Sequence, residues 1–567
     1  MELLFLHVLY TLLLLTNAES SIASLQLSWT RPRMRIHENL GFSVNISDAL
    51  PGINEPLFID VGLSMPLDHF SNSSVDGVTT FKNRFWINTT FYDLGGPVFI
   101  FDSGEQNAAP LVPYYLQEYH GLSATMRLAK RYGGLAILWE HRYYGDSLPF
   151  PIDKNTTVEQ WQFLTTEQAL QDVVFFADSF SKNSSSFTKY IAINSVADTL
   201  DPQSLPVHPS VTPWVWLGGS YPGVRAWASS APVHAQVDMW AYYAAAQRSL
   251  TVNCSADWVA VTSYVDNVLR GTNTTLIEDL KFDLLKARLS GPGGNTSGAD
   301  GLTKEQANKT SDVDVASILM DPLNFYQYYG FSASILPFCN LLETRNFTSN
   351  SAENGIVSLS GVEETFQAFL VALAELDYDS IPGSPDDPVA DMSWMRQYCS
   401  EYGFYQRGNP DNPLSIETSF QSLELFQQQC NEAFSDHLPS WPQVENINKY
   451  GGWDMRPSNI MFANGEFDPW RTMGLASIEP NSPQRKPSVV VPGCNVPSNA
   501  TTFFGITYDN MVHVSDMRVL LVPDSNHTDF KTVGFYSPVS QAPFYTGLGL
   551  FQLALDEWLP CFAANSG

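Results

Sequence analysis

The stretch Trp214-Val215-Trp216-Leu217-Gly218-Gly219-Ser220-Tyr221-Pro222-Gly223 decides the fold that we expect for this chain. Its first four residues are apolar and predict a buried strand, and the small residues that follow permit a sharp turn. A serine on a strand-to-helix turn projects its hydroxyl away from the backbone, and the next N–H points toward a reacting carbonyl oxygen. Pro222 departs from the usual Gly-x-Ser-x-Gly pattern. A Gly-Gly-Ser turn alone is more often a plain loop, so the nucleophile hypothesis depends on the rest of the chain.

Two later segments supply the partners that a nucleophilic serine requires. Asp468 follows an apolar run at 460–463, and His527 follows a second run at 519–522, so both runs predict strands. The chain order Ser, Asp, His, with each residue just past the carboxyl end of a strand, is typical of α/β-hydrolases. In this hypothesis His527 takes the proton of Ser220, and Asp468 orients the imidazole and stabilises its cation. Each residue alone could be an ordinary loop residue, and their joint order favours the triad.

Five separated motifs extend through most of the chain. They are Leu67-Asp68-His69-Phe70, Gly95-Gly96-Pro97-Val98-Phe99, Glu140-His141-Arg142-Tyr143-Tyr144-Gly145 with Ser147-Leu148-Pro149-Phe150, Trp227-Ala228-Ser229-Ser230-Ala231-Pro232-Val233, and Asn464-Gly465-Glu466-Phe467-Asp468-Pro469-Trp470. In content and order they resemble the motifs of the S28 family of serine peptidases, which includes lysosomal Pro-Xaa carboxypeptidase, dipeptidyl peptidase II and fungal acid prolyl peptidases. The resemblance implies an α/β-hydrolase fold and a peptidase, exo- or endo-acting, that cleaves on the carboxyl side of proline.

The resemblance also assigns residues around the triad. By analogy with the hydrolase fold, the oxyanion hole consists of the N–H of Tyr221 and an N–H from the loop that contains Gly104 and Glu105. Trp470 falls where the family has a pocket wall, and Val224 falls where it has a further apolar wall. A proline pocket needs an apolar, aromatic lining because the proline ring offers no hydrogen bond. Ordinary core packing is an equally good interpretation of Trp470 and Val224.

The composition narrows the range of partners. Asp and Glu number 59 against 30 Lys and Arg, which gives a formal net charge of −29, and no stretch is strongly basic. Nucleic acid and anionic membranes are therefore poor partners, and we expect a peptide or protein substrate. We expect no cofactor, and the absence of a Cys/His cluster in the sequence argues against a metal site. Whether the chain forms a homodimer stays open.

The amino terminus predicts entry into the secretory pathway. Residues 3–15 are apolar and small residues follow, which is typical of a signal peptide over residues 1–18 and too short to cross a bilayer. We therefore expect a secreted protein, or one that reaches a lysosome or vacuole. We expect glycans at the acceptor motifs of Asn45, Asn72, Asn88, Asn155, Asn183, Asn253, Asn273, Asn295, Asn308, Asn346 and Asn499. The motif at Asn526 abuts His527, where a glycan would crowd the site, so we expect it to be unused.

The chain has six cysteines, an even number that is compatible with three disulfides in a secreted protein. The sequence alone leaves all pairings open. The family resemblance favours Cys399 with Cys430. Of the pairings then left open, we expect Cys254 with Cys339 and Cys494 with Cys561.

The distribution of helical and strand patterns predicts two domains. Strands and helices alternate in residues 50–233 and again in 449–567, which predicts one discontinuous catalytic domain with a mainly parallel sheet. Residues 234–448 carry helical patterns, which we interpret as a cap domain inserted between sheet strands and closing over the site. An independent binding domain is the alternative. The clearest helical patterns lie at 258–269, 276–289 and 362–376.

The chain departs from the family after Ser220. Only residues 221–226 separate Ser220 from Trp227, where the family has a full helix and a loop. At about 1.5 Å per residue this link spans less than two helical turns, and a crossover between parallel strands usually needs about a dozen residues. A splice form, a gene-model error or a rebuilt local fold would explain it. Three hypotheses therefore stay open: an active serine peptidase, a catalytically impaired secreted glycoprotein, and a serine esterase on the same fold.

Overall fold

A nine-stranded sheet crosses the molecule in the order β1-β2-β4-β3-β5-β6-β9-β11-β10. The computed structural model describes residues 59–116, 123–182, 207–221, 226–290, 296–324, 326–375, 387–409, 411–434, 438–514, 516–517, 520–523, 530–533 and 547–564. The sheet consists of β1 (Ile59–Pro66), β2 (Thr80–Asn88), β3 (Val98–Asp102), β4 (Leu135–Trp139), β5 (Trp214–Gly219), β6 (Trp227–Ser229), β9 (Met461–Gly465), β10 (Lys486–Ser488) and β11 (Thr502–Tyr508). The β1–β2 and β2–β4 pairs are antiparallel, and all pairs from β4 onward are parallel. This sheet confirms the predicted α/β class.

Helices cover both faces of the sheet because its central strands are apolar on both sides. Every residue of β3 and β4 is buried, as expected for parallel strands between two helical layers. Phe99 and Phe101 point to one face and pack in the same cluster as α5 (Ala124–Tyr132) and α22 (Gly547–Ala564). Val98 and Ile100 point to the other face, where they pack with Phe176 of α7 (Thr166–Lys182). The period of two along β3 thus separates two cores.

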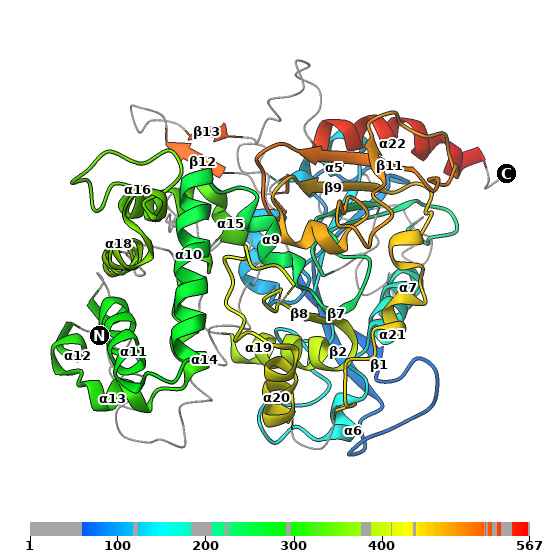
Figure 1. Cartoon of the computed structure of the whole chain (residues 1–567). Coiled ribbons are helices and arrows are strands. Elements are labelled where there is room, and N and C mark those ends of the chain that lie inside the picture. The colour runs from blue at the N-terminus through cyan, green and yellow to red at the C-terminus, as the bar shows by residue number, and fades with distance from the viewer. Residues whose placement is uncertain are drawn as a thin grey trace.

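The region between β7 (Gln236–Asp238) and β9 is mainly helical. Its longer helices are α10 (Val252–Leu269), α11 (Thr274–Ser290), α16 (Leu336–Glu343), α18 (Val362–Ala374) and α20 (Leu423–Phe434). Three of them confirm the helices predicted from residues 258–269, 276–289 and 362–376. Trp258, Phe338 and Phe369 form the centre of a separate core. Figure 1 shows α10, α11, α16 and α18 gathered on one side of the view, opposite α7 and α22.

Shorter elements complete the described part of the chain. On the sheet side they are η1 (Ala109–Leu111), α4 (Val112–Tyr115), α6 (Val158–Trp161), η8 (Gly452–Asp454) and η9 (Pro469–Met473). In the helical region they are α9 (Ala241–Gln247), α12 (Thr296–Gly301), α13 (Lys304–Lys309), α14 (Asp312–Ser317), η4 (Ile318–Leu323), α15 (Tyr326–Gly330), η5 (Phe331–Ile335), α17 (Val357–Ser360), α19 (Pro388–Gln397), η6 (Tyr398–Tyr402), β8 (Gly403–Tyr405) and α21 (Glu445–Asn448). Among the described residues, no helix has the length and apolar character needed to span a bilayer.

The three disulfides confirm the predicted pairing. Cys254 is bonded to Cys339, which ties α10 to α16 in the helical region. Cys399 is bonded to Cys430 and joins η6 to α20. The third bond, between Cys494 and Cys561, holds the end of α22 to the loop before β11. Each of the two regions is therefore cross-linked within itself.

Two strand pairings differ from what the sequence suggests. The apolar run at 519–522 does form a strand, β12 (Leu520–Pro523), but β12 pairs antiparallel with β13 (Phe530–Val533) in a separate two-stranded sheet. The expectation that it belongs to the central sheet is wrong, because an apolar run does not specify its pairing partner. Conversely, β5 and β6 are parallel neighbours, with Leu217 opposite Trp227, despite the short link between them. The central sheet is therefore continuous across this link.

Candidate active site

Ser220 lies on a turn that directly continues β5. Its φ of 62° falls in the left-handed region, which is strained for a residue with a side chain. The backbone N–H donates to the carbonyl of Ser229 at 2.9 Å, which ties the turn to the end of β6. The side chain is 6% exposed. A strained serine at the carboxyl end of a central parallel strand is the backbone feature that a nucleophile turn requires.

Asp468 follows β9 and begins the short helix η9. Its Oδ1 accepts the N–H of Trp470 at 2.9 Å, so the carboxylate serves as the N-cap of this helix. The residue is fully buried. Because β9 lies next to β6, which in turn lies next to β5, Asp468 and Ser220 occupy the same edge of the sheet.

The partner of Asp468 is His513, a residue that the sequence reasoning missed. His513 Nδ1 lies 2.9 Å from Asp468 Oδ1, and both side chains are fully buried. His513 follows β11, which pairs in parallel with β9, so both residues lie beyond the carboxyl ends of neighbouring strands. The signal was available in the sequence, because Val512 and Val514 place this histidine in an apolar turn just after the 502–508 strand. The sequence patterns instead placed the base after the apolar run at 519–522.

The turn that carries His513 is fixed to the centre of the sheet. The N–H of Val514 donates to Ser230 Oγ at 2.8 Å, and Ser230 directly follows β6, between the strands of Ser220 and Asp468. Within the described part of the chain, His513 Nε2 is buried and has no hydrogen-bond partner. With Nδ1 directed to a carboxylate, Nε2 is the nitrogen that remains to exchange a proton with a substrate or a nucleophile.

His527, the predicted base, lies outside the described residues. The strands on either side of it, β12 and β13, form the separate hairpin, and Figure 1 shows this hairpin apart from β9 and β11. The structure thus pairs Asp468 with His513, and it describes no contact of His527.

A second carboxylate, that of the half-buried Asp516, lies close to this histidine turn. Asp516 accepts hydrogen bonds from the indole of Trp227 at 3.2 Å and from the hydroxyl of Ser229. Burial raises the pKa of Asp516 to about 6, although these bonds oppose the shift. Asp516 and Ser230 thus both hold the turn of His513 against the end of β6.

The loop after β3, which the sequence analysis assigned to the oxyanion hole, lies beside the serine turn. β3 and β5 pair in parallel, with Asp102 opposite Gly218. Asp102 Oδ1 accepts the N–H of Gly104 at 3.0 Å and lies 2.6 Å from His141 Nε2. The N–H of Gly104 is therefore engaged within the loop itself. Glu105, the next residue of this loop, is 6% exposed.

Trp470 lies against the Asp468–His513 pair. Its ring centroid is 6.1 Å from that of His513 and 5.1 Å from that of Phe404 of the helical region. Its indole N–H donates to Gln327 Oε1 at 3.0 Å. Trp470 thus borders both the pair and the helical region. Val224, the other predicted pocket residue, lies outside the described residues.

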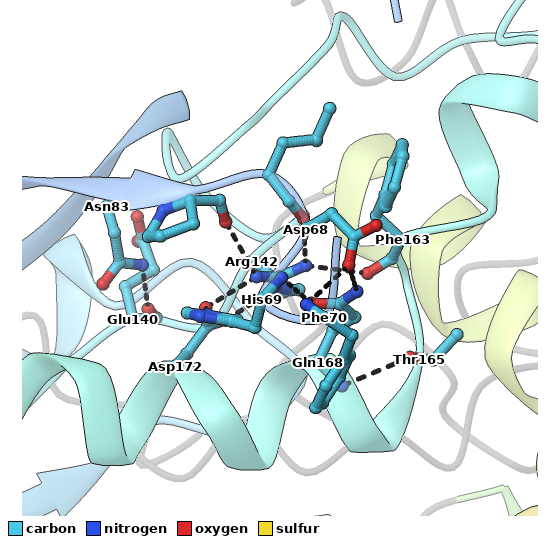
Figure 2. Close-up of polar contacts among 12 residues, drawn as sticks. Asp68, His69, Phe70, Asn83, Glu140, Arg142, Phe163, Thr165, Gln168 and Asp172 are labelled. Carbon is cyan, nitrogen blue, oxygen red and sulfur yellow. Dashed lines mark hydrogen bonds and ion pairs between the residues drawn. The ribbon is translucent and has the colours of Figure 1, made fainter. Parts of the chain in front are cut away.

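Two of the motifs that suggested the family form a buried polar network. Figure 2 shows Arg142 against Asp172, where Arg142 Nε donates to Oδ2 and Nη2 donates to Oδ1, both at 2.6 Å. His69 Nε2 lies 2.7 Å from the same carboxylate, and the guanidinium also donates to the carbonyl of Phe163 at 3.0 Å. Removing one partner from such a network leaves a buried charge uncompensated. These motif residues hold β1, β4 and α7 together, and they make no described contact with the triad residues.

The described acceptor motifs for glycosylation differ in accessibility. Asn88 is 2% exposed and its amide donates to the carbonyl of Leu116 at 2.6 Å. A glycan at Asn88 would have to break this contact at the end of β2, so we no longer propose it. Half-buried positions are Asn253 and Asn346, and exposed positions are Asn72, Asn155, Asn273, Asn308 and Asn499. Asn45, Asn183, Asn295 and Asn526 lie outside the described residues.

In the part of the chain that the structure describes, no group of three or more His, Cys, Asp or Glu side chains could hold a metal ion.

Comparison with known proteins identifies the family of this chain. The family described as Serine carboxypeptidase S28 matches residues 65–494, and the chain belongs to this family. The chain is 26% identical to "Serine protease vicPb" of Bipolaris victoriae over 72% of its own length and 78% of the relative. It is 27% identical to "Probable extracellular serine carboxypeptidase" of Arthroderma benhamiae, over 76% of its own length and 62% of the relative. "Lysosomal Pro-X carboxypeptidase" of Mus musculus is 24% identical over 72% of this chain and 78% of the relative.

Proposed function

We propose that this chain is a serine peptidase in which Ser220 is the nucleophile, His513 the general base and Asp468 its orienting carboxylate. The observation that supports this most strongly is the buried contact of 2.9 Å between His513 Nδ1 and Asp468 Oδ1. A histidine held in this way carries its proton on Nδ1 and presents Nε2 as the acceptor for a serine proton. His513 takes the place of His527 in this proposal because the contact to Asp468 belongs to His513.

The reaction proceeds through an acyl-enzyme. Ser220 Oγ bonds to the substrate carbonyl carbon while its proton passes to His513 Nε2. The resulting oxyanion accepts hydrogen bonds from the N–H groups of Tyr221 and Glu105. The carbon–nitrogen bond then breaks, and His513 returns the proton to the leaving amine. Water then gives a proton to His513 Nε2 while its oxygen bonds to the acyl carbon. The ester bond to Ser220 Oγ breaks, His513 returns the proton to Ser220 Oγ, and the carboxylic product leaves.

The proline preference is supported by the surroundings of Trp470. The rings of Tyr242 and Phe404 contact it edge-on, with centroids at 5.7 and 5.1 Å, so one aromatic wall borders the proposed triad. A flat, apolar wall suits a proline ring, which gains from contact area and offers no N–H to bind. The relative named for Pro-X carboxypeptidase activity supports the same preference. We therefore propose cleavage on the carboxyl side of proline.

The helical residues 234–448 are proposed as a cap over this site. Phe404 contacts Trp470, and Gln327 accepts the Trp470 indole N–H, so residues from this region reach the wall beside the triad. Such a cap limits the space available to a bound peptide. Its contacts would therefore determine whether the peptidase acts on chain ends or on internal bonds.

We also propose that the chain travels through the secretory pathway. The signal-like residues 1–18, the three disulfides and the accessible glycosylation motifs support this. The names of the extracellular and lysosomal relatives point to the same compartments, outside the cell or in a lysosome or vacuole.

A fluorophosphonate probe tests the central proposal, because it forms a covalent bond only with an activated serine. We expect labelling of the secreted, disulfide-bonded protein at Ser220, with hydrolysis of Pro-containing peptides. Folded protein that is not labelled would instead support the catalytically impaired glycoprotein, for which the short link at 221–226 is the motivating feature. Labelled protein that cleaves esters and no peptides would support the serine esterase.

A further inference from the structure

Gln397 holds the side chain of the residue that follows the proposed nucleophile. Its Nε2 donates to the hydroxyl of Tyr221 at 2.6 Å, and its Oε1 accepts from the hydroxyl of Tyr144. Gln397 is the last residue of α19 and is fully buried. One amide thus joins three parts of the molecule that are far apart in sequence: the nucleophile turn, the motif after β4 and the helical region.

Aromatic rings from the same parts of the molecule enclose Tyr221. Its ring centroid lies 5.0 Å from that of His141, 5.9 Å from that of Tyr402 and 6.0 Å from that of Trp394, each near edge-on. Trp394 and Tyr402 belong to α19 and η6, which the Cys399–Cys430 disulfide fixes to α20. Burial raises the pKa of Tyr221, so its hydroxyl stays protonated and available for hydrogen bonding.

The nucleophile turn needs such an external anchor. Only residues 221–226 connect Ser220 to β6, so the link is too short for the long helix that usually supports a nucleophile. An N–H that stabilises an oxyanion must be preorganised, because an error of about 1 Å in its position can cost on the order of a hundredfold in rate. The side chain and the N–H of Tyr221 belong to one residue, so fixing the former restricts the latter.

We propose that Gln397 is a positioning residue that aims the N–H of Tyr221 at the oxyanion through the Tyr221 side chain. The inference deepens the proposed peptidase function and rests on it. Helix α19 thereby takes over the support that the short link cannot supply.

The experiment compares Gln397→Leu, Tyr221→Phe and the double variant with the wild type. Each single change removes one side of the hydrogen bond, so each is expected to lower kcat by on the order of tenfold to a hundredfold, with KM nearly unchanged. The double variant is expected to lose less than the sum of the two single losses, because both changes remove the same contact. Gln397→Leu also removes the contact with Tyr144. Titration with the fluorophosphonate normalises each rate to the concentration of folded active sites.

Tyr405→Phe is the matched control. Its hydroxyl also donates to a glutamine of the helical region, Gln427 Oε1 at 3.0 Å, but it makes no described contact with Tyr221. The control is expected to keep the kcat of the wild type, because it makes no described contact with Tyr221 or Gln397. Affinity for a peptide boronate, which forms a tetrahedral adduct with the serine, is expected to fall in parallel with kcat only for the Gln397 and Tyr221 variants.

Two results would overturn the inference separately from the proposed function. One is a wild type that is labelled and active while Gln397→Leu retains the kcat of the Tyr405→Phe control. The other is a loss confined to the fraction of titratable sites, which would assign Gln397 to stability alone. A wild type that is not labelled at Ser220 would overturn both the inference and the peptidase proposal.

Discussion

The two halves of the candidate site are held in different ways. Asp468 and His513 are fixed by the sheet: one caps η9 after β9, and the other lies in a turn that bonds to Ser230 after β6. The turn of Ser220 begins on the sheet, but the side chain of its neighbour Tyr221 is anchored by Gln397 of the helical region. The acid–base pair therefore depends on strand register, whereas the nucleophile turn also depends on packing between regions distant in sequence.

The largest expected effect distinguishes the two histidines. His513→Ala and Ser220→Ala should each lower kcat by on the order of 10⁶-fold, with little further loss in the double variant, because the two groups act as one unit. His527→Ala is the control and should leave kcat unchanged. The steady-state rate of hydrolysis of a Pro-containing peptide is measured for each of the four variants and compared with that of the wild type. Loss of activity in His527→Ala with retention in His513→Ala would refute the assignment and return the base to His527.

A smaller loss is expected from Asp468→Asn. The amide keeps the shape of the side chain but no longer stabilises the His513 cation or its productive tautomer, so kcat should fall by about 10⁴-fold. Labelling by the fluorophosphonate should slow in the same proportion. An unchanged labelling rate would mean that the contact between Asp468 and His513 serves stability and not proton transfer.

The aromatic wall should affect substrate preference more than chemistry. Trp470→Leu is expected to lower kcat/KM for proline peptides by about ten- to a hundredfold, because a pocket wall of the right shape contributes on that scale to discrimination. Hydrolysis of a small activated ester should change much less. Trp441→Leu, at a Trp that is 39% exposed in the helical region, serves as the control. Equal losses for peptide and ester would place Trp470 in the core and leave the proline pocket without support.

We expect the stability of the helical region to depend on pH through a buried pair of carboxyl groups, Asp257 and Glu343. Asp257 accepts the N–H groups of Ile356 and Val357 at 2.7 and 2.8 Å, and the buried Glu343 interacts with it, with Asn253 and Arg345 as the other facing groups. Burial, and then the charge of Asp257, raises the pKa of Glu343 to about 8. A carboxyl group whose pKa is raised in the folded state stabilises the fold below its unfolded value near 4.5, and this contribution is lost as pH rises toward 8.

The stability test uses Glu343→Gln. Between pH 5 and 8, the wild type should lose on the order of 1–3 kcal/mol of unfolding free energy that the glutamine variant retains, since glutamine stays neutral. Glu305→Gln, at an exposed carboxylate paired with Lys309, should show the wild-type slope. Thermal unfolding at each pH provides the measurement. Parallel pH curves for the wild type and Glu343→Gln would contradict the raised pKa of Glu343. They would also mean that Glu343 does not make the stability of the helical region depend on pH.

Local patterns were sufficient to predict much of the fold. The apolar runs at β3, β4 and β5 identified a buried parallel sheet, because such strands must be apolar on both faces. The periodic stretches that became α10, α11 and α18 marked the helical region, and the family resemblance favoured the Cys399–Cys430 pair. The apolar run at 519–522 predicted a strand but not its pairing partner. That strand, β12, pairs with β13, and β11 is the strand that borders β9.

By itself, the sequence determined the class of the protein, because its motifs carry that information, and it placed Ser220 and Asp468 after apolar runs that do form strands of the sheet. Only the tertiary structure decided which histidine meets Asp468, since strand order and not sequence distance brings β9 and β11 together. The same holds for Gln397, which is separated from Tyr221 by 176 residues. A long-range hydrogen bond leaves no periodic pattern, because it depends on how whole layers pack and not on the residues next to it.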